Sequence, residues 1–106
     1  MTTSHFNNLT EAELERLSIL IEECAEVQQI ACKVLRHGYP SVNPLIPETT
    51  SNRQYLEIEL GHLMNALDLL LNHGDVHLSR VQQARKQKAG SIGKWLHHQA
   101  PAATTV

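Results

Sequence analysis

The chain has 106 residues, which argues for a single domain with one modest hydrophobic core. Aromatic residues are few and Leu and Ala dominate the apolar set, which favours packed helices over sheets. The formal net charge is −2 with neutral histidines, so a nucleic-acid partner and a membrane partner are not expected. No apolar run resembles a signal peptide or could span a bilayer, and we therefore expect a cytoplasmic protein.

The first predicted helix runs from a cap at Thr10 to about His37. Thr10 and Glu13 have the spacing of a capping box, in which each side chain hydrogen-bonds to the backbone of the other residue. Two apolar rows then recur at helical spacing and make a wide stripe for burial. Gly38 suits a left-handed position at the helix end. Because the helix exceeds the usual length, one break within residues 15–22 is also open.

The second predicted helix follows a long loop, residues 38–50, which contains three prolines. Such loops are often functional. Ser51 and Gln54 form a second capping-box pattern, and a leucine stripe follows until Gly74, which is expected to end the helix. Gly61 lies inside this helix, where glycine costs stability, and it suggests a close approach of another backbone.

Two further helices are expected in the C-terminal third. Asp75 is positioned to cap a third helix that runs to about Ala89, with Gly90 as its stop. Ser91 is positioned to cap a short fourth helix that carries Trp95. The predicted fold is thus all-α, an antiparallel bundle of three to four helices.

The predicted domain organisation has three parts. Residues 1–9 form a flexible arm, residues 10–99 the helical domain, and residues 100–106 a disordered tail. A bundle this small would complete its core through helix faces of other copies, so we expect a homodimer or a homotetramer. Cys24 and Cys32 are eight residues apart on one predicted helix, too far to bridge, and are expected as free thiols.

Two pairs of polar residues flank the apolar stripes of the first two helices. Glu23 and Glu26 are three residues apart, and Glu59 and His62 repeat that spacing on the second helix. Residues three apart share one side of a helix, so packing through the stripes could bring all four together. A divalent cation would relieve the repulsion among the carboxylates, and oxygen ligands suit Mg²⁺ or Mn²⁺. A solvated acidic face with ordinary ion pairs is the alternative.

The segments Glu22-Glu23-Cys24-Ala25-Glu26 and Glu59-Leu60-Gly61-His62 carry a family resemblance. In that order, they resemble the MazG-like, all-alpha nucleoside triphosphate pyrophosphohydrolases, whose pattern is Glu-Glu-x-x-Glu on one helix and Glu-x-x-Asp on the next. The lysine-rich stretch 83–99 is similar to the C-terminal part of short phage and bacterial members. The resemblance covers most of residues 10–99.

The resemblance implies an activity and roles for four glutamates. Family members use Mg²⁺, or Mn²⁺, to cleave a nucleoside triphosphate between its α- and β-phosphates, which gives a nucleoside monophosphate and pyrophosphate. Carried over by position, Glu23, Glu26 and Glu59 would be metal ligands. Glu22 would orient or activate the attacking water, so Glu22 and Glu23 are the catalytic candidates.

His62 departs from this pattern, because it stands where the family has aspartate. It is the fourth candidate ligand, and imidazole suits Mn²⁺ or other transition metals better than Mg²⁺. The substitution leaves open a weakened activity, a changed metal preference, or loss of the chemistry. The alternative function is therefore a catalytically weak or inactive MazG-like module that binds a nucleotide or a protein partner.

Five further residues are candidates for substrate binding. Lys33, Arg36, Lys86 and Lys88 could hold phosphates, and they are chosen by charge and location. Asn65 lies on the same side of the second predicted helix as His62, so its amide could hydrogen-bond a ligand or nucleotide.

Overall fold

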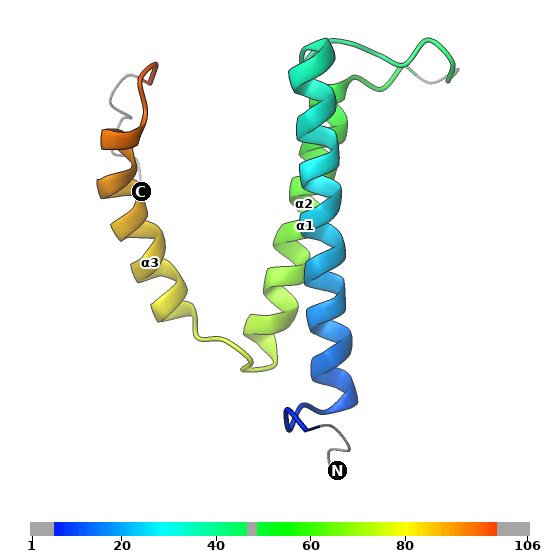
Figure 1. Ribbon diagram of the computed structural model, residues 1–106. Coiled ribbons are helices and arrows are strands. Elements are labelled where there is room, and N and C mark those ends of the chain that lie inside the picture. The colour runs from blue at the N-terminus through cyan, green and yellow to red at the C-terminus, as the bar shows by residue number, and fades with distance from the viewer. Residues whose placement is uncertain (1–5, 47–48, 100–106) are drawn as a thin grey trace. The chain divides into compact units, whose positions relative to one another are not determined.

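The computed structural model describes residues 6–46 and 49–99, which form three α-helices and a short 3₁₀ helix (Figure 1). In chain order these elements are α1 (Glu11–His37), α2 (Asn52–Asn72), α3 (Leu78–Ser91) and η1 (Ile92–Trp95). In this part of the chain there is no strand, and the single β pairing is a bridge between Val42 and Ser51. The predicted all-α fold class is confirmed. None of the described helices is long and apolar enough to cross a membrane.

The chain divides into two compact units, Met1–Asp75 and Val76–Val106. The first contains α1 and α2, and the second contains α3 and η1. Of the predicted N-terminal arm and C-terminal tail, residues 1–5 and 100–106 lie outside the described residues.

The helix α1 is capped as its sequence predicts. The Glu13 backbone N–H donates to Thr10 Oγ1 at 3.2 Å, and the Thr10 N–H donates to Glu13 Oε1 at 2.8 Å. The helix passes through residues 15–22 without a break and ends at His37. Gly38 follows with φ of +86°, a conformation that glycine adopts without the steric cost of a side chain.

The connection between α1 and α2 is anchored by hydrogen bonds at both ends. Ser51 and Gln54 form the predicted capping box at the start of α2. The backbone N–H of Asn52 donates to Ser41 O at 2.9 Å, and its side-chain amide donates to Gly38 O at 3.2 Å. The beginning of α2 therefore holds the chain where it leaves α1.

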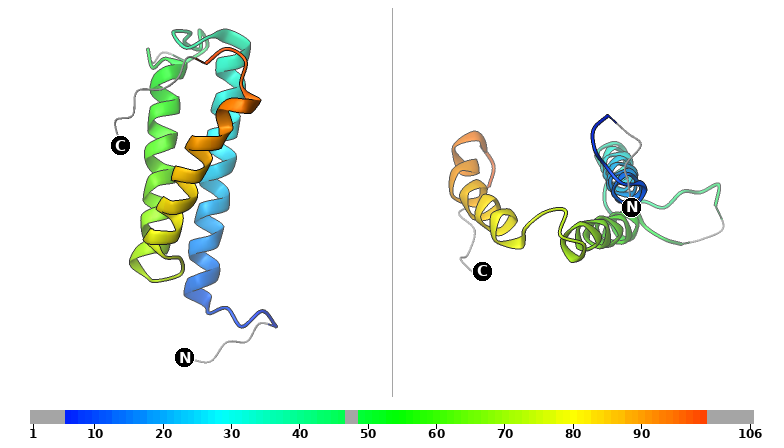
Figure 2. Two further views of the ribbon diagram at one scale, coloured as in Figure 1. Left: turned by 90° about the vertical axis from the view of Figure 1, so that its left-hand side faces the viewer. Right: turned by 90° about the horizontal axis from the view of Figure 1, so that it is seen from below.

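The helices α1 and α2 lie side by side and antiparallel (Figures 1 and 2). Ile30 of α1 and Ala66 and Leu70 of α2 are the buried apolar side chains among the described residues. Arg16 of α1 also forms a bidentate ion pair with Asp75, just beyond α2. Its Nε donates to Oδ2 at 2.6 Å and its Nη2 donates to Oδ1 at 3.0 Å. This hairpin is the scaffold of the candidate site.

The predicted role of Asp75 was wrong. Its carboxylate accepts from Arg16 and does not cap α3, which begins at Leu78 after His77 without a side-chain cap. A bidentate, charge-assisted pair with a guanidinium is stronger than one hydrogen bond from a backbone N–H. The carboxylate of Asp75 therefore pairs with Arg16 of α1 and leaves α3 without a side-chain cap.

Three other local predictions also need correction. Gly90 does not stop α3, which continues to Ser91. Ser91 does not cap the next element, which is a 3₁₀ helix ending at Trp95, and its hydroxyl lies 3.4 Å from Lys88 O. A Cβ built on Gly61 would meet nothing within 4 Å, so no backbone approaches that glycine closely.

Candidate metal centre

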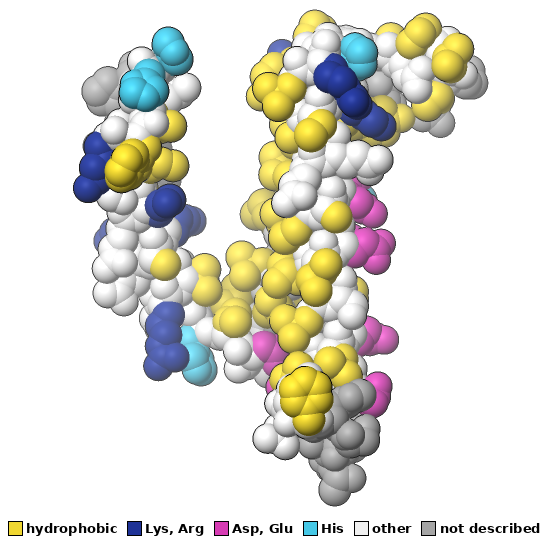
Figure 3. All heavy atoms as spheres, viewed as in Figure 1, with side chains coloured by type: hydrophobic (Ala, Val, Ile, Leu, Met, Phe, Trp, Pro, Cys, Tyr) yellow, Lys and Arg dark blue, Asp and Glu magenta, His cyan; other side chains and the backbone are white. Residues whose placement is uncertain are grey.

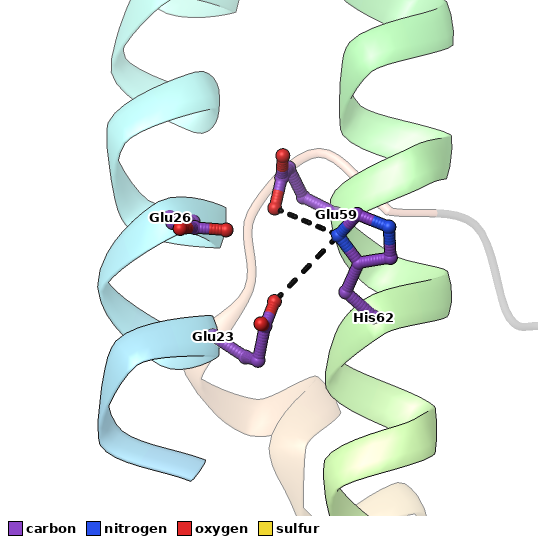
Figure 4. Close-up of side chains that lie close together, drawn as sticks. All are labelled: Glu23, Glu26, Glu59 and His62. Atoms are coloured by element: carbon purple, nitrogen blue, oxygen red, sulfur yellow. Dashed lines mark ion pairs between the residues drawn. The ribbon is translucent and has the colours of Figure 1, made fainter. Parts of the chain in front are cut away.

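The hairpin brings together the four side chains that the sequence singles out as ligands. Glu23 and Glu26 come from α1, Glu59 and His62 come from α2, and their side chains point toward one another (Figure 4). One potential ligand atom from each residue lies within 4.8 Å of the others. Three carboxylates and an imidazole thus surround one small volume between the helices.

This convergence follows from the helical repeat and the buried side chains. Glu23 precedes the buried Ile30 by seven residues, and Glu59 precedes the buried Ala66 by seven. Seven residues are nearly two turns, so each glutamate shares its helix face with a residue of the α1–α2 contact. Packing of the apolar residues consequently fixes the carboxylates at the seam.

Two carboxylate oxygens in the cluster lack hydrogen-bond partners. Glu23 Oε2 and Glu59 Oε2 are both hidden from solvent, and neither accepts a hydrogen bond. The His62 Nδ1 atom lies 3.5 Å from Glu59 Oε2 and 3.7 Å from Glu23 Oε2, and a protonated imidazole would form an ion pair with both. Buried carboxylate oxygens without partners are costly, and buried charges in proteins are normally paired with another group or coordinate a metal ion.

The pKa of Glu26 is also affected by the neighbouring negative groups. Its pKa is raised above the ordinary value, chiefly because its carboxyl hydrogen-bonds with Glu59, and burial raises it further. The His62 imidazole works in the opposite direction. Without a cation, the cluster therefore favours a proton held between two carboxyl groups.

Glu22, the candidate for water activation, lies outside this group of four. Its side chain is exposed, while the three other glutamates are half-buried. Because Glu22 and Glu26 are four residues apart, they share one side of α1. Glu22 therefore lies next to the four candidate ligands and is not one of them.

A pocket of about 630 Å³ opens beside the cluster and includes two of its members, Glu26 and Glu59, in its wall. Lys33 and Arg36, two of the substrate-binding candidates, also line it. Asn65 is exposed on α2 and is not part of this wall. Lys86 and Lys88 belong to α3 in the second unit and are exposed there.

The other residues that line the pocket were not predicted from the sequence. Three of them belong to α1, namely Gln29, Ile30 and His37. The rest come from the loop after α1 and from the start of α2, and they are Ser41, Val42, Asn43, Pro44, Ile46, Asn52 and Tyr55. Loop residues follow no period, so their direction cannot be deduced from spacing. The unusual length of the loop was the one available signal.

No family model, curated protein or solved structure matches this chain. The resemblance to the MazG-like family thus depends on the two motifs and on the stretch 83–99.

Proposed function

We propose that this protein is a divalent-metal-dependent nucleotide pyrophosphohydrolase, which cleaves a nucleoside triphosphate into a nucleoside monophosphate and pyrophosphate. The observation that carries the proposal is the convergence of Glu23, Glu26, Glu59 and His62 within 4.8 Å beside a pocket lined by two cations. The motif order and the resemblance to MazG-like enzymes supply the reaction type.

The donor set fits a divalent cation. The two buried carboxylate oxygens without partners, on Glu23 and Glu59, are the atoms that a cation would satisfy. We assign Glu23, Glu26, Glu59 and His62 as the residues that hold Mg²⁺ or Mn²⁺. When bound, the metal would neutralise phosphate charge and lower the pKa of a coordinated water.

The protein residues would perform the remaining steps. A water oxygen attacks the α-phosphorus, and the bond from that phosphorus to the oxygen bridging to the β-phosphorus breaks. Pyrophosphate leaves with the electrons of the broken bond, and Glu22 accepts the proton of the water. Lys33 and Arg36 hold the departing phosphates within the pocket.

The direct test is release of pyrophosphate from a panel of ribo- and deoxyribonucleoside triphosphates, with Mg²⁺ and then with Mn²⁺. We expect release from the parent protein and a loss of at least about 100-fold in Glu59→Gln, on the scale of losing one group that stabilises the transition state. Glu57→Gln is the matched control, because Glu57 is exposed on the same helix. Folded parent protein that releases no pyrophosphate with either metal would refute the proposal for those substrates.

His62 favours a second candidate function, a module that binds a nucleotide without turnover. Imidazole in place of carboxylate reduces the negative charge available to Mg²⁺. This candidate predicts metal-dependent nucleotide binding without pyrophosphate release, and calorimetry beside the hydrolysis assay distinguishes the two.

A further inference from the structure

The wall of the pocket beside the cluster has two basic side chains without acidic partners. Lys33 and Arg36 both line it, and among the described residues neither takes part in an ion pair. The negative groups in the wall, Glu26 and Glu59, belong to the metal-ligand cluster. The pocket thus joins a cation-binding end to a positively charged end, which suits a ligand with several linked anionic groups.

The helical geometry of α1 places these charges in a row. Lys33 follows Glu26 by seven residues, which is about 10 Å along the axis and nearly the same face. Arg36 lies one turn further on. Because side chains on a helix are tilted toward its N-terminus, we expect Lys33 to reach toward Glu26 and Arg36 to reach toward Lys33. A chain of phosphates that begins at the cluster would therefore meet the ammonium first and the guanidinium second.

The C-terminal end of α1 would ordinarily repel an anion, because its last carbonyls carry partial negative charge. Here the side-chain amide of Asn52 donates to Gly38 O at 3.2 Å and approaches Lys33 O at 3.5 Å. These contacts give a hydrogen-bond donor to one carbonyl in the last turns of α1 and to one just beyond its end. Asn52 thus makes the end of the helix more tolerant of phosphate.

We propose that Lys33 and Arg36 form a subsite for the terminal phosphates of the substrate, in which Arg36 holds the phosphate farthest from the cluster. Arg36 would therefore favour triphosphates over diphosphates, while Lys33 serves both. The inference rests on the proposed function for placing the first phosphate of the chain at the metal-ligand cluster.

The test uses the full chain with saturating Mn²⁺ and two probes without a base, inorganic tripolyphosphate and pyrophosphate, measured by calorimetry. We expect the parent to bind tripolyphosphate more tightly. Arg36→Gln should weaken tripolyphosphate about 10- to 100-fold, the range for hydrogen bonds to charged groups, and pyrophosphate by less than about threefold. Lys33→Gln should weaken both probes. Arg53→Gln is the matched control, because Arg53 stacks on Tyr39, 4.7 Å from the ring centre, and does not line the pocket.

Several results would overturn the subsite. They are a parent without preference for tripolyphosphate, equal losses for both probes in Arg36→Gln, or an equal effect of Arg53→Gln. An Arg36→Gln protein that melts at a lower temperature but binds both probes normally would assign Arg36 to the helix dipole alone. Hydrolysis is scored separately: absence of pyrophosphate release refutes the enzyme, and absence of an Arg36-dependent preference refutes the subsite.

Discussion

The imidazole of His62 occupies the position at which the MazG-like pattern has aspartate, and it lies 3.5 Å from Glu59 Oε2. It is also the most exposed member of the cluster, with 56% of its side chain accessible against 18% for Glu23 and 21% for Glu59. The two half-buried carboxylates, Glu23 and Glu59, would therefore form the fixed part of the site. His62 stands at its open side and would set the preference among metals.

Replacement of His62 by aspartate should raise Mg²⁺-dependent pyrophosphate release. A carboxylate supplies the hard oxygen ligand and the negative charge that Mg²⁺ prefers. We expect an increase of about tenfold in kcat/KM, the lower end of the range for a change around a metal. His62→Asn, which lacks the charge, is the control. A His62→Asp protein no more active with Mg²⁺ than the parent would contradict this role.

The roles of Glu22 and Glu23 can be separated by metal binding without nucleotide. At a Mn²⁺ concentration about 100 times the Kd, binding should stabilise the parent by about 2.7 kcal/mol, visible as a higher melting temperature. Glu23→Gln should lose this shift, because it removes a ligand. Glu22→Gln should keep the shift and still lose hydrolysis. Loss of the shift in Glu22→Gln would instead make Glu22 a ligand.

At the scale of single elements, the predictions that held were local. The capping boxes at Thr10 and Ser51 depend on side chains within three residues, so the sequence alone identifies where α1 and α2 begin. Asp75 failed because its partner, Arg16, is 59 residues away. The three-residue spacing within each polar pair likewise predicted that the four candidate ligands could share a seam. The pocket wall around Pro44 comes from a loop, whose residues follow no periodic pattern from which their direction could be predicted.

The open surroundings of Gly61 predict a stabilising substitution in α2. A Cβ at this position meets nothing within 4 Å, and alanine is favoured over glycine inside a helix by about 1 kcal/mol. Gly61→Ala should therefore raise the free energy of unfolding by about that amount in urea titrations. Gly74→Ala should do the reverse, because Gly74 has φ of +76°. A destabilised Gly61→Ala would mean that another backbone approaches in solution.

The Arg16–Asp75 pair predicts a pH-dependent contribution to stability. The hydrogen bond from Arg16 lowers the pKa of Asp75 below its ordinary value of 3.8. A carboxyl whose pKa is lowered by folding stabilises the fold fully at pH values above its ordinary pKa. That contribution is lost as the pH falls through the lowered pKa. Asp75→Asn should thus melt several degrees below the parent at pH 7. The gap should begin to narrow below about pH 4 and should close as the pH falls through the lowered pKa of Asp75. Asp68→Asn, an exposed change on α2, is the control; a gap that does not narrow as the pH falls below about 4 would contradict the pair's role.

At the scale of the whole molecule, the hairpin leaves several large apolar side chains exposed. Ile21 is 69% exposed, Leu35 85% and Met64 68%. On the hairpin face shown in Figure 3, hydrophobic side chains form a broad band beside a row of acidic ones. By helical spacing, these three residues lie on the flank opposite the His62 side of the hairpin. A second copy on that flank would leave the candidate metal site open.

We therefore predict self-association through the apolar flank, and Met64→Lys should abolish it. Burying an ammonium without a partner costs several kcal/mol, more than a small interface can offset. Light scattering after gel filtration should give the parent at least twice the 11.9 kDa mass of one chain, and Met64→Lys that single mass. Asn72→Lys, an exposed change on another side of α2, should stay associated. A monomeric parent at micromolar concentration would contradict this prediction. The hairpin would then be stable with its apolar flank exposed to water, with Ile30, Ala66 and Leu70 as the buried apolar side chains of the described residues.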